Sequence, residues 1–284
     1  MDKPGHGPPR PAISAAMSLP EDALQTLRDT SRTFFEPIVR LPAGLQEAVG
    51  AAYLCMRAID EIEDHLTLTA PEKAQLLRHV SLTLQAVPKE IPRTLASERV
   101  ELPEVTQRLG DWLSLAPPAI APRIADAIAT MAERMAHWAD IGWRVRDEAD
   151  LDRYTYGVAG AVGLLLSDLW AWYAAIQTDR LRAVGFGRGL QAVNILRNHQ
   201  DDLARGVNLY PDGWDDRRMH SYARRHLALA DAYLLDLPAG PILDSCRIPL
   251  ALAYATLEVL EGGRDKLSRR EVQEILEGVA PAAD

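Results

Sequence analysis

The sequence predicts an all-α protein with a single domain, and three observations support this. From Pro20 onward, apolar residues recur at spacings of three and four, which is the period of an amphipathic helix. Short Pro and Gly segments interrupt the pattern, as expected at helix ends. The sequence contains neither alternating strand-like runs nor a repeat of fixed period. With 48% apolar residues, a chain of 284 residues can also bury a substantial core.

The helices can be placed in order from their start and stop signals. Several Pro and Gly residues in positions 1–19 predict a disordered tail rather than a secretory signal, so the domain is expected at 20–284. Glu21 and Asp22 mark the first helix start, since acidic side chains favour a first turn. Further helices are predicted at 45–65, 71–86, 104–115, 120–143, 151–176 and 180–204. Two or three more should follow the polar loop 205–216, and 87–103 should be loop or short turns.

Composition and charge exclude several classes of protein. The chain has 31 Lys and Arg against 40 Asp and Glu, a net charge of −9, which argues against nucleic-acid binding. No transmembrane segment is expected, because Ser167 and Asp168 break the most apolar window, 159–176. Two cysteines are too few for a disulfide framework or a zinc cluster, so a cytoplasmic location is expected. The arginines at 217, 218, 224 and 225 indicate a solvated face or a peripheral membrane contact.

A first polar stripe lies on the predicted helix 45–65. Tyr53, Arg57, Asp60 and Asp64 follow one another at spacings of three and four, so they share one face. Charges on an otherwise apolar helix are costly unless they are paired or bind a metal. Two carboxylates one turn apart can bind Mg²⁺, which prefers oxygen ligands. The alternative is a solvated acidic helix end.

A second polar stripe lies on the predicted helix 180–204. Gln191, Asn194, Asn198 and Asp202 are spaced by three, four and four residues. If this helix faces the first, the acidic ends of both could hold Mg²⁺ against a diphosphate, and nearby arginines could neutralise the remaining charge. The carbon that loses the diphosphate would be an allylic cation, which needs an apolar pocket without water.

Four motifs in this order resemble the squalene and phytoene synthases, a family within the class I isoprenoid synthase fold. The first is Ser31-Arg32-Thr33-Phe34, and the second is the first polar stripe, which resembles the family's DxxxD motif. The third is the small-residue segment 154–163. The fourth combines the second polar stripe with Arg205-Gly206-Val207-Asn208-Leu209-Tyr210. The resemblance covers about residues 25 to 215.

The resemblance implies a helical bundle around a central cavity, Mg²⁺ as cofactor and an allylic prenyl diphosphate as substrate. It also implies roles for particular residues. Metal ligands would be Asp60, Asp64, Asn198 and Asp202. Phosphate contacts would come from Ser31, Thr33, Arg57 and Arg197, and the polar cavity wall from Gln191 and Asn194. The prenyl chain or its cation would meet Phe34, Tyr53 and Tyr154, because aromatic faces stabilise cations. Tyr210 would also bind substrate.

One departure from the family pattern leaves the acceptor open. Asn198 stands where the family has Asp, and it keeps an oxygen ligand but loses a charge. The family's usual reaction, head-to-head condensation of two prenyl diphosphates, is the first expectation. The alternatives are transfer of the prenyl group to an aromatic small molecule, cyclisation of one substrate as in a terpene cyclase, and a non-catalytic helical partner protein. No nicotinamide site is indicated.

Overall fold

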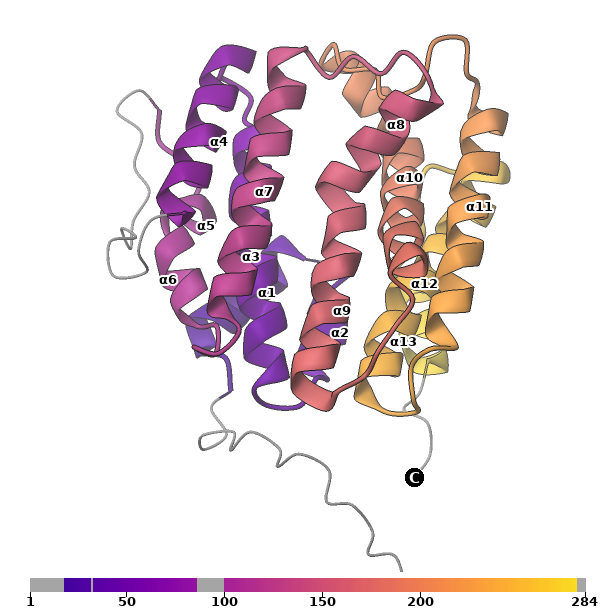
Figure 1. The fold of residues 1–284 in the computed structure, drawn as a ribbon. Helices are drawn as coiled ribbons and strands as arrows, with labels where there is room; N and C mark the ends of the chain where they lie inside the picture. Colours follow the sequence, from indigo (N-terminus) through magenta and orange to yellow (C-terminus); the bar gives the residue numbers. More distant parts are fainter. Residues whose placement is uncertain (1–17, 32, 86–99, 280–284) are drawn as a thin grey trace, which may run out of the picture.

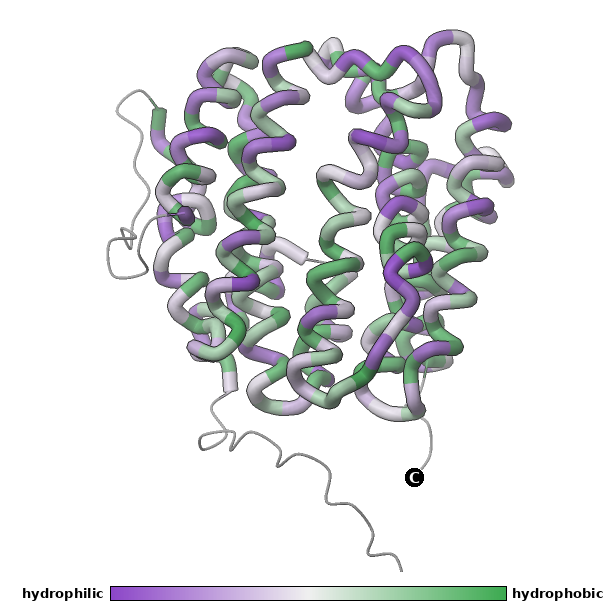
Figure 2. Tube along the Cα trace, viewed as in Figure 1, coloured by the Kyte–Doolittle hydropathy of each residue, from purple (hydrophilic) through white to green (hydrophobic). Residues whose placement is uncertain are grey.

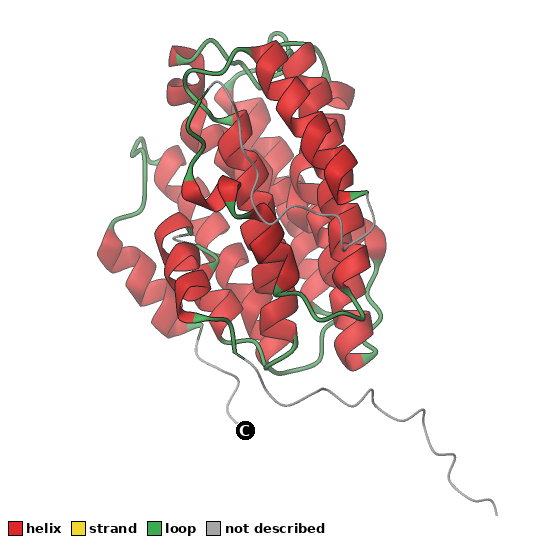
Figure 3. Ribbon diagram, turned by 90° about the vertical axis from the view of Figure 1, so that its left-hand side faces the viewer, coloured by secondary structure: helices red, strands yellow, loops and turns green. Residues whose placement is uncertain are grey.

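The computed structural model describes residues 18–31, 33–85 and 100–279, and within these ranges the chain is helical and without strands (Figures 1 and 3). The helices are α1 Glu21–Thr30, α2 Phe35–Val39, α3 Leu45–Glu63, α4 Ala70–Leu84, α5 Glu104–Gln107, α6 Leu109–Ser114, α7 Ala121–Asp140, α8 Glu148–Thr155, the π-helix η2 Tyr156–Gly160, α9 Ala161–Ala174, α10 Arg180–Ala204, α11 Asp216–Leu234, α12 Pro241–Glu261 and α13 Arg269–Gly278. The predicted all-α class is confirmed.

Local capping explains where the long helices begin. Thr69 and Glu72 form a capping box at the start of α4, in which the Glu72 carboxylate accepts from the Thr69 backbone N–H. The Asp179 side chain accepts from two backbone N–H groups in the first turn of α10. Asp215 does the same for α11. These caps place the helix starts within a few residues of the positions predicted from the sequence.

The observed helices differ from the predicted ones in three places. The predicted helix 104–115 is two short helices, because the chain leaves helical geometry at Arg108. The short helix α2 was not predicted. The predicted helix 151–176 begins earlier, at Glu148, because Asp147 caps it, and contains the π-turn η2. Most of the predicted loop 87–103 and most of the predicted tail 1–19 lie outside the described residues, but Leu19 is buried and would contact a Cβ added to Gly50.

The long helices pack as an up-and-down bundle in which α3 and α10 each contact several other helices. In Figure 1, α7, the α8–α9 segment, α10 and α11 stand side by side. Helix α10 packs against α9, η2, α11 and α12, while α3 packs against α5, α6 and α7, and α7 packs against α4. Figure 2 shows hydrophobic and hydrophilic positions alternating along the helices, as amphipathic packing requires. One continuous cluster of buried apolar side chains joins the helices around α3 to the helices around α10.

Small residues allow α10 to approach its neighbour closely. A Cβ added to Gly163 would lie 2.0 Å from the Ala183 carbonyl oxygen, and one added to Gly187 would lie 2.2 Å from the Ala159 carbonyl oxygen. Since both obstacles are backbone atoms, neither contact could relax by a side-chain movement. Gly163 of the small-residue segment 154–163 and Gly187 of α10 therefore allow the α8–α9 segment and α10 to approach closely.

The continuous helical segment Glu148–Ala174 is long and apolar enough to cross a membrane by length and composition alone. It packs against α7 and α10, and 33% of its most apolar window is buried. The partly accessible side chains of Val158, Val162 and Leu166 pack against the core at the i, i+4 spacing of one helix face.

Candidate active site

The two polar stripes meet at the C-terminal ends of α3 and α10. The Arg205 guanidinium donates to Asp64 Oδ1 over 3.1 Å and to Asp202 Oδ1 over 2.5 Å. Asp64 and Arg205 are separated by 141 residues in the chain. The contact shows that the acidic C-terminal ends of α3 and α10 lie next to each other.

On α3, the charged side chains surround Asp60. Arg57 forms ion pairs with Glu61 and, over 3.9 Å, with Asp60 Oδ2. The Asp60 side chain is 38% exposed. Burial raises the pKa of Asp60 to about 7, with Arg57 lowering it and Asp64 raising it further. Asp60 and Asp64 thus face the same region as expected.

On α10, Asp202 is buried, whereas the amides form a network of their own. Burial raises the pKa of Asp202, and the hydrogen bond from Arg205 opposes this. Asn194 Oδ1 accepts from Arg197 Nη2 over 2.7 Å and from Asn198 Nδ2 over 3.2 Å. Arg197 Nε also donates to Asn198 Oδ1 over 3.2 Å. The Asn198 oxygen therefore already accepts a hydrogen bond. Gln191 is half-buried on the same helix.

Tyr154 lies beside the meeting point of the two stripes. Its ring meets Trp138 edge-on, with 5.4 Å between centroids. Burial raises the pKa of its hydroxyl well above the usual range, and the negative charges of Glu63, Asp64 and Asp202 add to this effect. Tyr154 is therefore a neutral hydroxyl close to the carboxylates, and its predicted contact with the prenyl chain or the cation stays a prediction.

The segment around residues 30–34 packs against the apolar half of the α3 stripe. The Tyr53 hydroxyl donates to the Thr30 carbonyl over 3.2 Å, and its ring lies 5.8 Å from that of Phe34. The buried Ser31 hydroxyl accepts from the Phe34 backbone N–H. Thr33 is half-buried next to this group. The structure thus brings the first and second motifs together one helical turn from Arg57.

Tyr210 has a different environment from the other predicted site residues. Its ring stacks on His199, with 3.8 Å between centroids and 10° between planes. Its hydroxyl donates to Asp216 Oδ1 over 2.9 Å. These contacts tie the loop after α10 to the first turn of α11. Its predicted contact with substrate stays a prediction.

Three residues beside the site were not found from the sequence as site residues. Trp143 Nε1 donates to Glu63 Oε1 over 2.6 Å, and Lys73 Nζ donates to the Glu63 carbonyl over 2.5 Å. The Lys73 ammonium also lies 5.3 Å from the Trp143 ring centroid. Trp143 has φ 51°, a left-handed conformation that is strained for a bulky residue. The contacts of Lys73 and Trp143 with Glu63 therefore hold the last turn of α3 in place.

The donor atoms at this site suit a hard cation, although they do not form a ready-made cage. Among residues 18–31, 33–85 and 100–279, no three His, Cys, Asp or Glu side chains converge closely enough to hold an ion. Asp60, Asp64 and Asp202 nevertheless supply the oxygen ligands that Mg²⁺ prefers. They also lie at two helix C-termini, where the helix dipoles add negative charge. This arrangement requires cations, and Arg205 already provides one.

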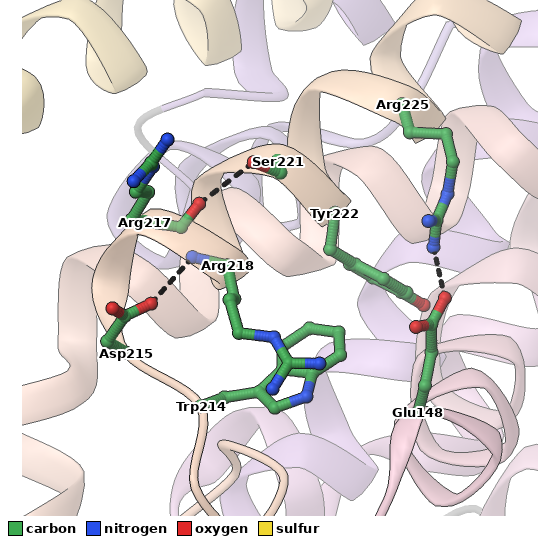
Figure 4. A pocket seen from close by; sticks show the side chains of 8 residues that line it. All are labelled: Glu148, Trp214, Asp215, Arg217, Arg218, Ser221, Tyr222 and Arg225. Atoms are coloured by element: carbon green, nitrogen blue, oxygen red, sulfur yellow. Dashed lines mark hydrogen bonds and ion pairs between the residues drawn. The ribbon is translucent and has the colours of Figure 1, made fainter.

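A separate pocket lies between α8 and α11. It has a volume of about 340 Å³. Figure 4 shows its lining side chains, which are Glu148, Trp214, Asp215, Arg217, Arg218, Ser221, Tyr222 and Arg225. Glu148 pairs with Arg225, and Asp215 caps α11. None of the predicted site residues lines this pocket, so it is distinct from the meeting point of the two stripes.

The sequence matches known proteins over most of its length. The family model for squalene/phytoene synthase matches residues 27–214. The squalene synthase of Schizosaccharomyces pombe is 28% identical over 266 residues, covering 82% of this chain and 58% of that protein. The squalene synthase of Homo sapiens is 27% identical over 257 residues, covering 81% and 61%. The chain thus spans about three fifths of the length of these curated relatives.

Solved structures show the same fold. A complex of the squalene synthase TcSQS with a ligand superposes with a TM-score of 0.72 at 21% identity, covering 91% of this chain and 85% of that chain. A ligand complex of a dehydrosqualene synthase gives a TM-score of 0.60 at 19% identity, covering 91% and 94%. The family model matches 188 of the 284 residues, a span that contains all four motifs and the meeting point of α3 and α10. This chain therefore belongs to the squalene/phytoene synthase family.

Proposed function

We propose that this protein is a Mg²⁺-dependent prenyltransferase that ionises an allylic prenyl diphosphate at the meeting point of α3 and α10. It then joins the prenyl group head to head to a second prenyl diphosphate, forming a carbon–carbon bond. The observation that carries this proposal is the pair of hydrogen bonds from Arg205, because it brings Asp64 of the first polar stripe and Asp202 of the second polar stripe to one point. The family membership supports the same reaction class.

The side chains around the acidic ends have complementary roles in this reaction. Mg²⁺ held by Asp60, Asp64 and Asp202 would neutralise the charge that develops on the departing diphosphate. Arg57 lies one turn before Asp60 and supplies a guanidinium for the diphosphate oxygens. Tyr154 keeps its proton and can donate it in a hydrogen bond to a developing negative charge.

The prenyl chain requires an apolar surface next to these charges. Tyr53 and Phe34 present aromatic rings one turn from Arg57. The face of the α8–α9 segment that carries Val158, Val162 and Leu166 continues the apolar surface from Tyr154. These side chains would exclude water from the carbocation and thereby prevent its hydrolysis.

The experiment that tests the proposal is a substrate panel. The purified protein is incubated with farnesyl or geranylgeranyl diphosphate, with and without Mg²⁺, and both pyrophosphate release and product mass are measured. We expect Mg²⁺-dependent release and a product containing two prenyl groups. A cyclised single-substrate product, or a product formed only with an added aromatic acceptor, would overturn the head-to-head reaction. Absence of release from every allylic diphosphate would favour a non-catalytic helical partner.

We also propose a cytoplasmic protein that contacts an anionic membrane peripherally through the start of α11. Arg217 and Arg218 are exposed there, and the Arg218 guanidinium lies 5.0 Å from the Trp214 ring centroid. Basic side chains near an aromatic residue suit an anionic lipid surface. We expect co-sedimentation with phosphatidylglycerol vesicles, reduced in an Arg217→Gln/Arg218→Gln variant and weak with phosphatidylcholine. Equal sedimentation of the two proteins would overturn this contact.

A further inference from the structure

We propose that Arg205 is a built-in counter-ion, which holds Asp64 and Asp202 while Mg²⁺ is absent and turns to the diphosphate when Mg²⁺ arrives. This inference rests on the proposed function. Arg205 belongs to the fourth motif, but helical spacing alone assigns it no role. Its two hydrogen bonds cross from the end of α10 to the end of α3, and they use one oxygen of each carboxylate.

The backbone of Arg205 is held by hydrogen bonds at the end of α10, whereas its side chain is partly exposed to solvent. Arg205 ends α10, and its backbone N–H donates to the carbonyls of Asp201 and Asp202. The next residue, Gly206, has φ +79°, and the Val207 backbone N–H returns to the Asp202 carbonyl, which closes the helix end. The Arg205 side chain is 42% exposed. It can therefore rotate away from the carboxylates without any change in the helices.

The charges around Arg205 explain why a counter-ion is required. Asp60, Glu63, Asp64 and Asp202 gather at two helix C-termini, and each raises the pKa of the Tyr154 hydroxyl between them. Lys73 lies near Asp64 on the other side but donates its hydrogen bond to the Glu63 carbonyl. Without Arg205, Asp64 and Asp202 would face each other without a cation between them. A guanidinium that donates to both removes this repulsion.

Arg205 and a metal ion compete for the negative charge of the same two carboxylates. Mg²⁺ bound to Asp64 or Asp202 would place a second cation beside the guanidinium, and this repulsion would weaken the corresponding hydrogen bond from Arg205. The released guanidinium is planar and carries paired donors, which match the geometry of phosphate oxygens. Because Arg205 is anchored at the end of α10, its released guanidinium stays close to Asp64 and Asp202. Arg205 should therefore oppose binding of metal alone and favour binding of the metal with a diphosphate.

Replacement of Arg205 should accordingly have opposite effects on two binding events. In Arg205→Gln, Mn²⁺ added alone, followed by electron paramagnetic resonance, should bind about threefold tighter or more, because a competing cation is lost. Inorganic diphosphate titrated calorimetrically in the presence of Mg²⁺ should bind about tenfold weaker, because a charge-assisted donor is lost. A merely structural role for Arg205 would weaken both.

Two further variants make the test specific. Arg205→Lys keeps the positive charge but not the planar pair of donors. We therefore expect an Mn²⁺ affinity near that of the original protein and an intermediate decrease in diphosphate affinity. Arg224→Gln is the matched control: Arg224 is 43% exposed and donates twice to the Glu261 carboxylate, away from the two stripes. This control should change neither affinity. Melting temperatures of all variants establish that each is folded.

The outcomes separate this inference from the proposed function. If Mn²⁺ binds Arg205→Gln with unchanged or weaker affinity, the counter-ion role is wrong even where the original protein releases pyrophosphate. If Mn²⁺ binds more tightly but diphosphate binding is unchanged, Arg205 does not turn to the substrate, and the second half of the proposal is wrong. If the original protein neither binds Mn²⁺ nor releases pyrophosphate, both the inference and the proposed function are overturned.

Discussion

At the scale of single residues, Asp60 and Asp64 are the side chains on which activity should depend most directly. Asp60→Asn or Asp64→Asn keeps the shape of the side chain but removes one charge from the acidic end of α3. We expect pyrophosphate release to fall by a factor of about 10² to 10³, typical for loss of one electrostatic contact to a transition state. Glu274→Gln on α13 serves as the control, since Glu274 is 60% exposed and pairs only with the neighbouring Arg270 among the described residues. Rates within twofold of each other would contradict the assignment.

His226 should make the stability of the fold depend on pH. It is buried, neither ring nitrogen has a hydrogen-bond partner in the described structure, and Asp152 Oδ1 lies 3.9 Å from Nε2. Burial, reinforced by the positive charges of Arg188 and Arg225, lowers its pKa from 6.5 to about 4, while Asp152 and Glu148 oppose this shift. The folded protein then binds this proton more weakly than the unfolded chain does.

The sign of the His226 effect follows from that difference. Its contribution to the free energy of unfolding is complete above pH 6.5 and is lost as the pH falls from about 6.5 to about 4, in total about 3 kcal/mol. Urea unfolding of the original protein and of His226→Phe, measured between pH 7.5 and pH 4, isolates this term. As the pH falls from 7.5 to 4, the free energy of unfolding of the original protein should decrease relative to that of His226→Phe. A difference between the two free energies that does not change with pH would refute the prediction.

The sequence predicted the carboxylates of the site and two of its arginines, Arg57 and Arg197, but not the contacts of Lys73, Trp143 and Arg205. Asp60, Asp64 and Asp202 could be found because each stripe follows helical spacing within one segment. The contacts of Lys73 and Trp143 with Glu63 could not be found in this way, because they span 10 and 80 residues. They depend on how the end of α3, the start of α4 and the chain after α7 pack together. Arg205 lay within a recognised motif, but its bond to Asp64 depends on the packing of α3 relative to α10.

At the scale of elements, the close approach of α9 to α10 depends on Gly163. An added methyl group would lie 2.0 Å from the Ala183 carbonyl oxygen, so the two helices would have to separate. We expect Gly163→Ala to lower the free energy of unfolding by about 1–3 kcal/mol, as overpacking does in other cores. Gly278→Ala, at a helix position with open space, should leave it unchanged or slightly raised. Similar melting temperatures for both variants would argue against the packing constraint.

Helix boundaries were predicted well where capping and apolar spacing agree. Helix α10 was predicted at 180–204 and is observed at Arg180–Ala204. The π-turn Tyr156–Gly160 was not predicted, because its extra residue per turn leaves no signal in apolar spacing. It ends at Gly160, where an added Cβ would lie 3.2 Å from the Val184 side chain of α10.

At the scale of the whole molecule, the net charge of −9 and the acidic ends of α3 and α10 predict stabilisation by divalent cations. A cation that binds only the folded state raises the melting temperature in proportion to its affinity and concentration. We expect Mg²⁺ with inorganic diphosphate to raise the melting temperature by several degrees, which for a chain of this size corresponds to about 1–2 kcal/mol. NaCl at equal ionic strength and an Asp60→Asn/Asp202→Asn variant are the controls. An equal rise in all three samples would indicate general screening.

The whole-molecule architecture could be predicted from the sequence because it depends on few rules. Helical spacing gave the class, and four ordered motifs gave the family. The acceptor could not be predicted. It depends on which side chains line the surface between Tyr53, Tyr154 and the α8–α9 segment, and this is set by helix placement rather than by any single motif.

The hydrogen bond between Trp143 and Glu63 offers a practical consequence. An indole that donates to a carboxylate and lies beneath an ammonium group has a fluorescence emission that responds to nearby charge. Because Glu63 immediately precedes Asp64, loading of the carboxylates should shift or quench the emission of Trp143. The protein therefore carries its own optical sensor, and comparison with Trp143→Phe would separate this signal from the emission of the other five tryptophans.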